Sequence, residues 1–215
     1  MNYLAHLFLS GESTSILVGN FIGDSVRGNQ FSTLDPDIQR GILLHRAIDR
    51  FTDTHPVVRR SKQRAQAVTG RYASVVIDVF YDHFLACDWA CHHAMPLPEY
   101  VRSVYTILAG WLKEFPDRSR RFYYYMVTHN ILESYRSIDG ITAVLEQMAE
   151  RAKFESNMEL AGNELVRGYR YYESEFKEFM PELQYYNKQA LAALTEPNDL
   201  QKISQALPAL TSYGV

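Results

Sequence analysis

The sequence has little cysteine and no long hydrophobic run. Its two cysteines, Cys87 and Cys91, stand at helical spacing beside two histidines. We interpret them as reduced thiols on one helix rather than as a disulfide framework or a thiolate zinc site. The opening stretch has no basic segment before its short apolar run, and no stretch approaches the roughly 18 apolar residues of a membrane-spanning helix. We therefore expect a cytoplasmic protein with no membrane partner.

Extreme charge is also absent. Lysine and arginine total 22 against 25 acidic residues, a net charge of -3, and 47% of the 215 residues are hydrophobic. These values are ordinary for a globular protein, so bulk charge gives no reason to expect a nucleic-acid partner. The length allows one sizeable core. We predict a single domain over residues 1–215, in which residues 1–95 carry the functional site and residues 96–215 complete the bundle.

No alternating strand pattern, hairpin turn or internal repeat competes with helix. Apolar residues recur every three or four positions, and hydroxyl, acidic, proline and glycine residues mark the segment ends. The expected helical segments cover residues 2–9, 13–26, 72–91, 97–115, 118–135, 138–153 and 158–193, the last interrupted at Pro181. A further helix is expected to start at residues 35–37, to carry His45 and Asp49, and to end before Pro56. This pattern predicts an all-α, multi-helix bundle.

The strongest chemical signal lies in residues 41–55, GILLHRAIDRFTDTH. His45 and Asp49 are four residues apart, so on a helix they share a face and can reach one cation. Their neighbours are apolar, and a buried charge without a partner is costly. Asp24 lies in another apolar segment. We expect these three side chains to contribute to one site.

A second apolar helix, VVIDVFYDHFL, repeats the pattern with Asp78, Asp82 and His83. Mixed imidazole and carboxylate ligands suit manganese, iron or magnesium better than a thiolate-type zinc site. The alternative is that the acids pair with nearby arginines or cap helices in a non-catalytic helical interaction protein. The predicted metal ligands are Asp24, His45, Asp49, Asp78, Asp82 and His83.

Three further histidine and acidic positions stay open to two interpretations. His55, with Asp53, is either an acid–base group or a group that supports the metal ligands, or it serves in helix capping and a turn before Pro56. His6 is isolated on an apolar helix, and we interpret it as a core histidine.

No glycine-rich phosphate loop or nucleophile elbow occurs. Hydrolysis by water activated at a metal is therefore the chemistry that the acidic clusters favour.

Residues 59–71, RRSKQRAQAVTGR, contain five cationic residues and no acid. Such a segment is either a solvated face or a docking surface for an acidic partner. Its position directly after the His45 segment favours docking. The predicted partner-binding residues are Arg59, Arg60, Lys62, Arg64 and Arg71.

Four stretches in the first ninety residues together form a specific pattern: MNYLAHLFLS, GNFIGDSVRG, GILLHRAIDRFTDTHP and DVFYDHFLACDW. With these stretches the chain resembles the acyl carrier protein phosphodiesterases, also called holo-acyl-carrier-protein hydrolases. The resemblance implies an HD-domain-like α bundle related to metal phosphohydrolases. It places the family's motif acid on Asp24, and its motif histidine and aspartate on His45 and Asp49. With His55, these are the predicted catalytic residues.

The same resemblance implies the reaction. Members of the family remove 4'-phosphopantetheine from holo-acyl carrier protein, an acidic partner, and depend on a divalent cation. We expect Mn²⁺, with Mg²⁺ or Fe²⁺ as alternatives. The second candidate function is an HD-like phosphohydrolase of nucleotides or other small phosphodiesters, which shares the metal site but does not need the basic segment.

Overall fold

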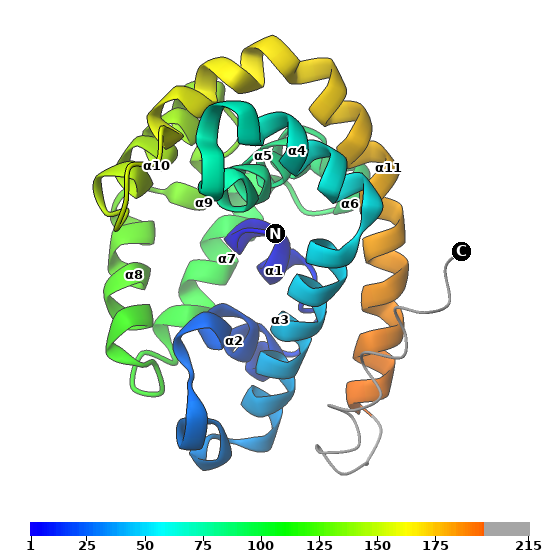
Figure 1. Ribbon diagram of the computed structural model, residues 1–215. Coiled ribbons are helices and arrows are strands. Elements are labelled where there is room, and N and C mark those ends of the chain that lie inside the picture. Colours follow the sequence, from blue (N-terminus) through cyan, green and yellow to red (C-terminus); the bar gives the residue numbers. More distant parts are fainter. Residues whose placement is uncertain (196–215) are drawn as a thin grey trace. The chain divides into compact units, whose positions relative to one another are not determined.

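The computed structural model describes residues 1–195, and within this range every regular element is helical (Figure 1). The predicted all-α class is confirmed, whereas the HD-like arrangement stays a prediction. None of the described helices combines the length and hydropathy of a membrane span. The α-helices are α1 (Tyr3–Phe8), α2 (Thr14–Ile22), α3 (Pro36–Thr54), α4 (Pro56–Thr69), α5 (Ala73–Cys87), α6 (Trp89–His92), α7 (Leu97–Ala109), α8 (Asp117–Thr128), α9 (Ile131–Ser134), α10 (Ile138–Glu150) and α11 (Ala161–Thr195). Four 3₁₀ turns join them: η1 (Gly23–Ser25), η2 (Gly28–Thr33), η3 (Gly70–Tyr72) and η4 (Met158–Leu160).

The chain forms two compact units. The first contains residues 1–5, 54–102 and 129–180, and the second contains residues 6–53, 103–128 and, within the described part of the chain, 181–195. The predicted single domain over residues 1–215 stays a prediction, and its residues 196–215 lie outside the described part of the chain.

In the second unit, α2 and α3 cross at two glycines. A Cβ added to Gly19 would lie 2.1 Å from the Ile38 carbonyl oxygen, and one added to Gly41 would lie 2.2 Å from the Ile16 carbonyl oxygen. Any other residue would therefore force the two backbones apart. This close crossing brings the end of α2 next to the middle of α3.

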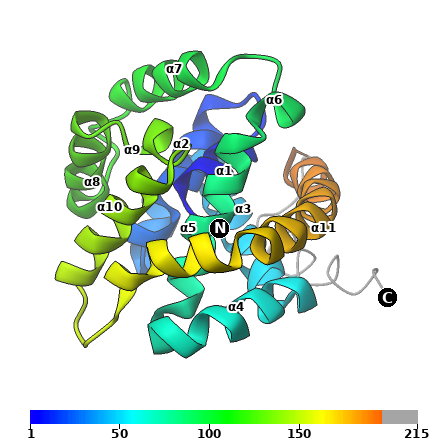
Figure 2. The ribbon, with the colours of Figure 1, turned by 90° about the horizontal axis from the view of Figure 1, so that it is seen from above.

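In the first unit, α5 is the central helix. α4 and α10 both pack against it (Figure 2), and most of its side chains are buried, as its apolar sequence predicts. Tyr81 of α5 makes an edge contact with Phe176 of α11, with ring centroids 5.7 Å apart. The Tyr81 hydroxyl lies 2.8 Å from the Ser61 hydroxyl of α4.

Some helix boundaries differ from those expected. The predicted break at Pro181 is wrong, because α11 continues through this residue. Pro181 is exposed, while Met180 and Leu183 on either side of it are fully buried. Burial of its neighbours therefore holds the helix despite the missing backbone donor. The break before Pro56 is confirmed, since His55 is extended at φ -68°, ψ 131°.

Candidate metal centre

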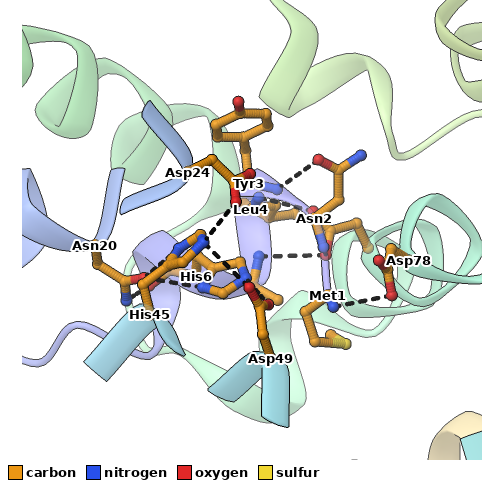
Figure 3. A network of polar contacts seen from close by, with 12 residues as sticks. Met1, Asn2, Tyr3, Leu4, His6, Asn20, Asp24, His45, Asp49 and Asp78 are labelled. Atoms are coloured by element: carbon orange, nitrogen blue, oxygen red, sulfur yellow. Dashed lines mark hydrogen bonds and ion pairs between the residues drawn. The ribbon is translucent and has the colours of Figure 1, made fainter. Parts of the chain in front are cut away.

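Polar side chains from four elements converge inside the second unit (Figure 3). The elements are α1, α2, η1 and α3, and each supplies at least one polar side chain. Asp24 and Asp49 keep 61% and 39% of their side-chain surface exposed, so the group is open to solvent on the carboxylate side. The converging residues are His6, Asn20, Asp24, His45 and Asp49.

The two imidazoles are stacked. The ring centroids of His6 and His45 lie 4.2 Å apart with 25° between the planes, and both residues are about 95% buried, with exposures of 4% and 5%. Gly23 leaves room for the second ring, because a Cβ added there would lie 2.5 Å from Cγ of His45. Because the rings are stacked, their Nδ1 edges face one way and their Nε2 edges face the other (Figure 3).

One edge of both rings faces the amide of Asn20. Its Oδ1 lies 2.9 Å from Nδ1 of His6 and 3.3 Å from Nδ1 of His45. Its Nδ2 donates to the His6 carbonyl oxygen at 2.7 Å and to the Ser10 hydroxyl oxygen at 3.0 Å. These two acceptors fix which end of the amide faces the rings.

The other edge of both rings faces carboxylates. Nε2 of His6 lies 3.0 Å from Oδ1 of Asp49. Nε2 of His45 lies 3.2 Å from Oδ2 of Asp49 and 3.2 Å from Oδ1 of Asp24. One potential ligand atom from each of His6, His45 and Asp49 lies within 4.8 Å of the others, and among residues 1–195 this is the one such group of three or more.

The pKa values of the histidines and carboxylates in this cluster depend on one another. Burial lowers the pKa of His45, but hydrogen bonds to Asp24 and Asp49 outweigh burial and raise that pKa to about 9. Burial alone would raise the pKa of Asp49, but hydrogen bonds from both histidines hold it far below its usual range. The hydrogen bond from His45 also lowers the pKa of Asp24.

The donor set fits a divalent metal. His6 stands between two acceptors, the Asn20 oxygen at Nδ1 and the Asp49 carboxylate at Nε2. A neutral imidazole has one N–H, so it satisfies one acceptor and turns a lone pair toward the other. Burial and the charge of His45 lower the pKa of His6, which disfavours a second proton. A cation at the Nε2 edge removes this mismatch, because it accepts lone pairs from imidazole and carboxylate alike.

The structure thus brings together Asp24, His45 and Asp49, and it adds His6 and Asn20, which sequence analysis missed. The interpretation of His6 as a core histidine captured its burial but not its contacts. Both residues are polar and lie within apolar segments. This polarity could have indicated that they have partners in the core, because buried polar groups need partners. The roles of the three predicted residues as ligands stay predictions.

Asp78 and Asp82 lie on α5 in the first unit and contact the start of the chain. Oδ2 of Asp82, which is fully buried, accepts from the Leu4 amide at 2.7 Å, and its Oδ1 lies 3.3 Å from the amides of Asn2 and Ala5. Asp82 therefore caps α1. Burial raises the pKa of Asp82 to about 7. Asp78 accepts from the Met1 amino group at 2.9 Å.

His83 and His55 also lie in the first unit. Nδ1 of His83 donates to the Tyr135 carbonyl oxygen at 2.8 Å, and its Nε2 lies 3.2 Å from the Tyr169 hydroxyl. His55 precedes α4 and makes an edge contact with Phe179 at 4.9 Å. Neither these histidines nor the α5 acids belong to the group of potential ligands found among residues 1–195. The predicted metal-binding and catalytic roles of all four stay predictions.

The basic segment forms α4 and η3, and acids of α11 partly neutralise it. Arg60 pairs with Glu178, and Nη2 of Arg64 lies 3.0 Å from Oε1 of Glu175. Arg71 stacks on the Phe154 ring, 4.5 Å from its centroid. Arg60, Arg64 and Arg71 therefore have contacts within their own unit. Lys62 also has an interaction partner, and Arg59 is exposed.

Comparison with known proteins gives consistent matches. The family model described as acyl carrier protein phosphodiesterase matches residues 1–183. A protein of this name from Enterobacter sp. (strain 638) is 38% identical over 184 residues, which is 85% of this chain and 95% of the relative. Another from Salmonella agona (strain SL483) is 39% identical over 152 residues, 70% of this chain and 79% of the relative. No solved structure matches the chain.

Proposed function

Because this chain belongs to the acyl carrier protein phosphodiesterase family, we propose that it hydrolyses holo-acyl carrier protein to the apo form. Water adds to phosphorus, the bond from phosphorus to the carrier serine oxygen breaks, and that oxygen takes a proton. The products are apo-carrier protein and 4'-phosphopantetheine. The observation that carries this proposal is the convergence of His6, His45 and Asp49 at one open edge.

His6, His45 and Asp49 hold a divalent cation, with Mn²⁺ as the first choice and Fe²⁺ or Mg²⁺ as alternatives. Two imidazoles in the donor set favour manganese or iron over magnesium, which prefers oxygen ligands. When bound, the cation supplies Lewis-acid chemistry, polarising phosphoryl oxygens and acidifying water. Asn20 and Gly23 keep the imidazoles in place from the other side.

Asp24 orients the attacking water by accepting a hydrogen bond from it. Its carboxylate is the most exposed of the cluster, and its Oδ1 lies 3.2 Å from Nε2 of His45. The low pKa that His45 imposes keeps Asp24 ionised and able to orient water. Solvent access on this side leaves room for a phosphodiester carried by another protein.

The partner is holo-acyl carrier protein, and its acidic surface docks on the cations of α4 that remain exposed, beginning with Arg59. Docking would chiefly speed encounter and orient the carrier, as charge complementarity does elsewhere. We place the reaction in the cytoplasm.

Intact-mass spectrometry tests the proposal. Purified protein incubated with holo-carrier protein and Mn²⁺ should convert it to the apo mass, and chelator treatment should stop the conversion until Mn²⁺ is restored. Asp49→Asn should be inactive under the same conditions. If the carrier mass never changes while a panel of nucleotides or small phosphodiesters is hydrolysed, the small-molecule phosphohydrolase function replaces this one.

A further inference from the structure

We propose that Asn20 is a positioning residue that aligns two imidazoles with one side-chain oxygen, so that both Nε2 lone pairs point at the same cation. The inference rests on the metal site of the proposed function. Asn20 itself faces the Nδ1 edges and has no direct place among the metal ligands.

The two imidazoles share one acceptor, Oδ1 of Asn20. A carbonyl oxygen has two lone pairs, so Oδ1 of Asn20 can accept one N–H from each ring. The rings are stacked at 4.2 Å, which places both Nδ1 atoms within 3.3 Å of that oxygen. With both Nδ1 atoms protonated toward Asn20, the lone pairs of both rings lie on Nε2. In metal sites, the hydrogen bond at one ring nitrogen sets the tautomer in this way.

The side-chain amide of Asn20 is held in one orientation. Nδ2 donates to the His6 carbonyl oxygen and to the Ser10 hydroxyl, and that hydroxyl in turn donates to the same carbonyl at 2.8 Å. A flipped amide would set its oxygen against the carbonyl oxygen of His6. The acceptor is therefore fixed in place before any cation arrives.

Packing of the core alone does not require an amide side chain at position 20. Asn20 is 1% exposed and follows the apolar residues of α2, where an apolar side chain would avoid the cost of burying polar atoms. The polar atoms of Asn20 are accounted for by the two rings, the His6 carbonyl oxygen and the Ser10 hydroxyl. Removing the acceptor frees each ring to adopt the other tautomer or to rotate.

The test compares metal affinity in matched variants. Isothermal titration of chelator-stripped protein with MnCl₂ should show about 10- to 100-fold weaker binding for Asn20→Leu, the usual effect of losing such a hydrogen bond behind a metal ligand. Asn20→Asp keeps an oxygen acceptor for both rings, and as a buried protonated carboxyl group it can still donate from its second oxygen to the His6 carbonyl oxygen, so it should stay within tenfold of the wild type. Val18→Ala is the control for stability, because Val18 is fully buried in the same helix and lies on its opposite side. It should lower Tm without changing Mn²⁺ affinity.

The outcomes separate this inference from the proposed function. Wild-type affinity in Asn20→Leu, or equal loss in Val18→Ala, overturns positioning by Asn20. If Asn20→Leu does not fold by circular dichroism, Asn20→Asp decides: loss of more than tenfold overturns the inference. Absence of Mn²⁺ binding by the wild type also overturns it. If the variants follow the expected order but holo-carrier protein is not cleaved, the proposed function fails and the positioning role stands.

Discussion

Gly23 lies so close to the imidazole of His45 that no side chain fits at position 23. An added Cβ would be 2.5 Å from Cγ and 2.8 Å from Cβ of the histidine. The ring atoms nearest the backbone cannot move aside as the tip of a flexible side chain can. The position of one candidate ligand is therefore set by the backbone of η1.

Replacing this glycine with alanine should displace the His45 ring. We expect Gly23→Ala to weaken Mn²⁺ binding and to lower the free energy of unfolding by about 1–3 kcal/mol, the usual cost of overpacking. Calorimetric titration and urea unfolding measure the two effects. Gly110→Ala is the matched control, since the nearest atom to its added Cβ is 3.3 Å away. Wild-type Mn²⁺ affinity in Gly23→Ala would contradict the role given to His45.

Asp49→Asn should abolish the conversion of holo-carrier protein with at least about a 100-fold loss of rate, because a charged ligand shared by both imidazoles is removed. The rate is followed by intact mass at saturating Mn²⁺. Asp37→Asn, an exposed acid in the first turn of the same helix, should keep the wild-type rate. Equal rates for the two variants would exclude Asp49 from the site.

The stability of the metal-free protein should depend on pH through His45. Its pKa is raised from 6.5 to about 9 in the folded chain, so its protonated form stabilises the fold. This contribution is fully present below pH 6.5 and is lost as the pH rises through about 9. Tm in the presence of chelator should therefore fall between pH 7 and pH 9.5, and His45→Gln should flatten that fall. An unchanged slope in the variant would disprove the assignment.

Asp82→Asn should destabilise the first unit without a direct effect on metal binding. Both oxygens of Asp82 accept backbone amides, so an amide nitrogen in place of one oxygen leaves a buried donor facing another donor. The expected loss is about 1–3 kcal/mol in urea unfolding. The partly exposed Asp88→Asn serves for comparison and should cost less. If Asp82→Asn instead weakens Mn²⁺ binding at unchanged stability, the predicted ligand role of Asp82 is supported over the capping role.

Charge reversal on α4 tests docking. Arg59→Glu combined with Lys62→Glu should raise KM for holo-carrier protein severalfold, at about 0.2–1 kcal/mol per exposed pair. Arg60 and Arg64 are left intact because they pair with Glu178 and Glu175. Hydrolysis of a small phosphodiester should be spared.

The control for docking is the same charge change on α8, with Arg118→Glu and Arg121→Glu, which are exposed there. Equal losses on carrier protein and small substrate in the α4 variant would mean that α4 supports the fold. A raised KM in the α8 variant alone would move the docking surface to α8.

Sequence analysis predicted most of the helices, though not α4, and the local pair His45–Asp49, because both depend on spacing along one helix. It also found Asp24 through a motif. It missed His6 and Asn20 because their relevance arises only when α1, α2 and α3 pack together, a tertiary effect that periodicity does not report. The same limit applies to Asp82, whose apolar surroundings predicted burial with a partner but not that the partners are backbone amides.

The glycine contact between α2 and α3 makes the spacing of these two helices tolerant of substitutions elsewhere in the core of this chain. Main chain meets main chain at Gly19 and Gly41, so the separation of the two helices depends little on the size of the surrounding core side chains. Neighbouring apolar residues can be exchanged over evolutionary time while the spacing between the Asn20 side and the His45 side of the cluster is preserved. Sequence drift in this core and constancy of the chemistry are therefore compatible, as long as those two positions lack a side chain.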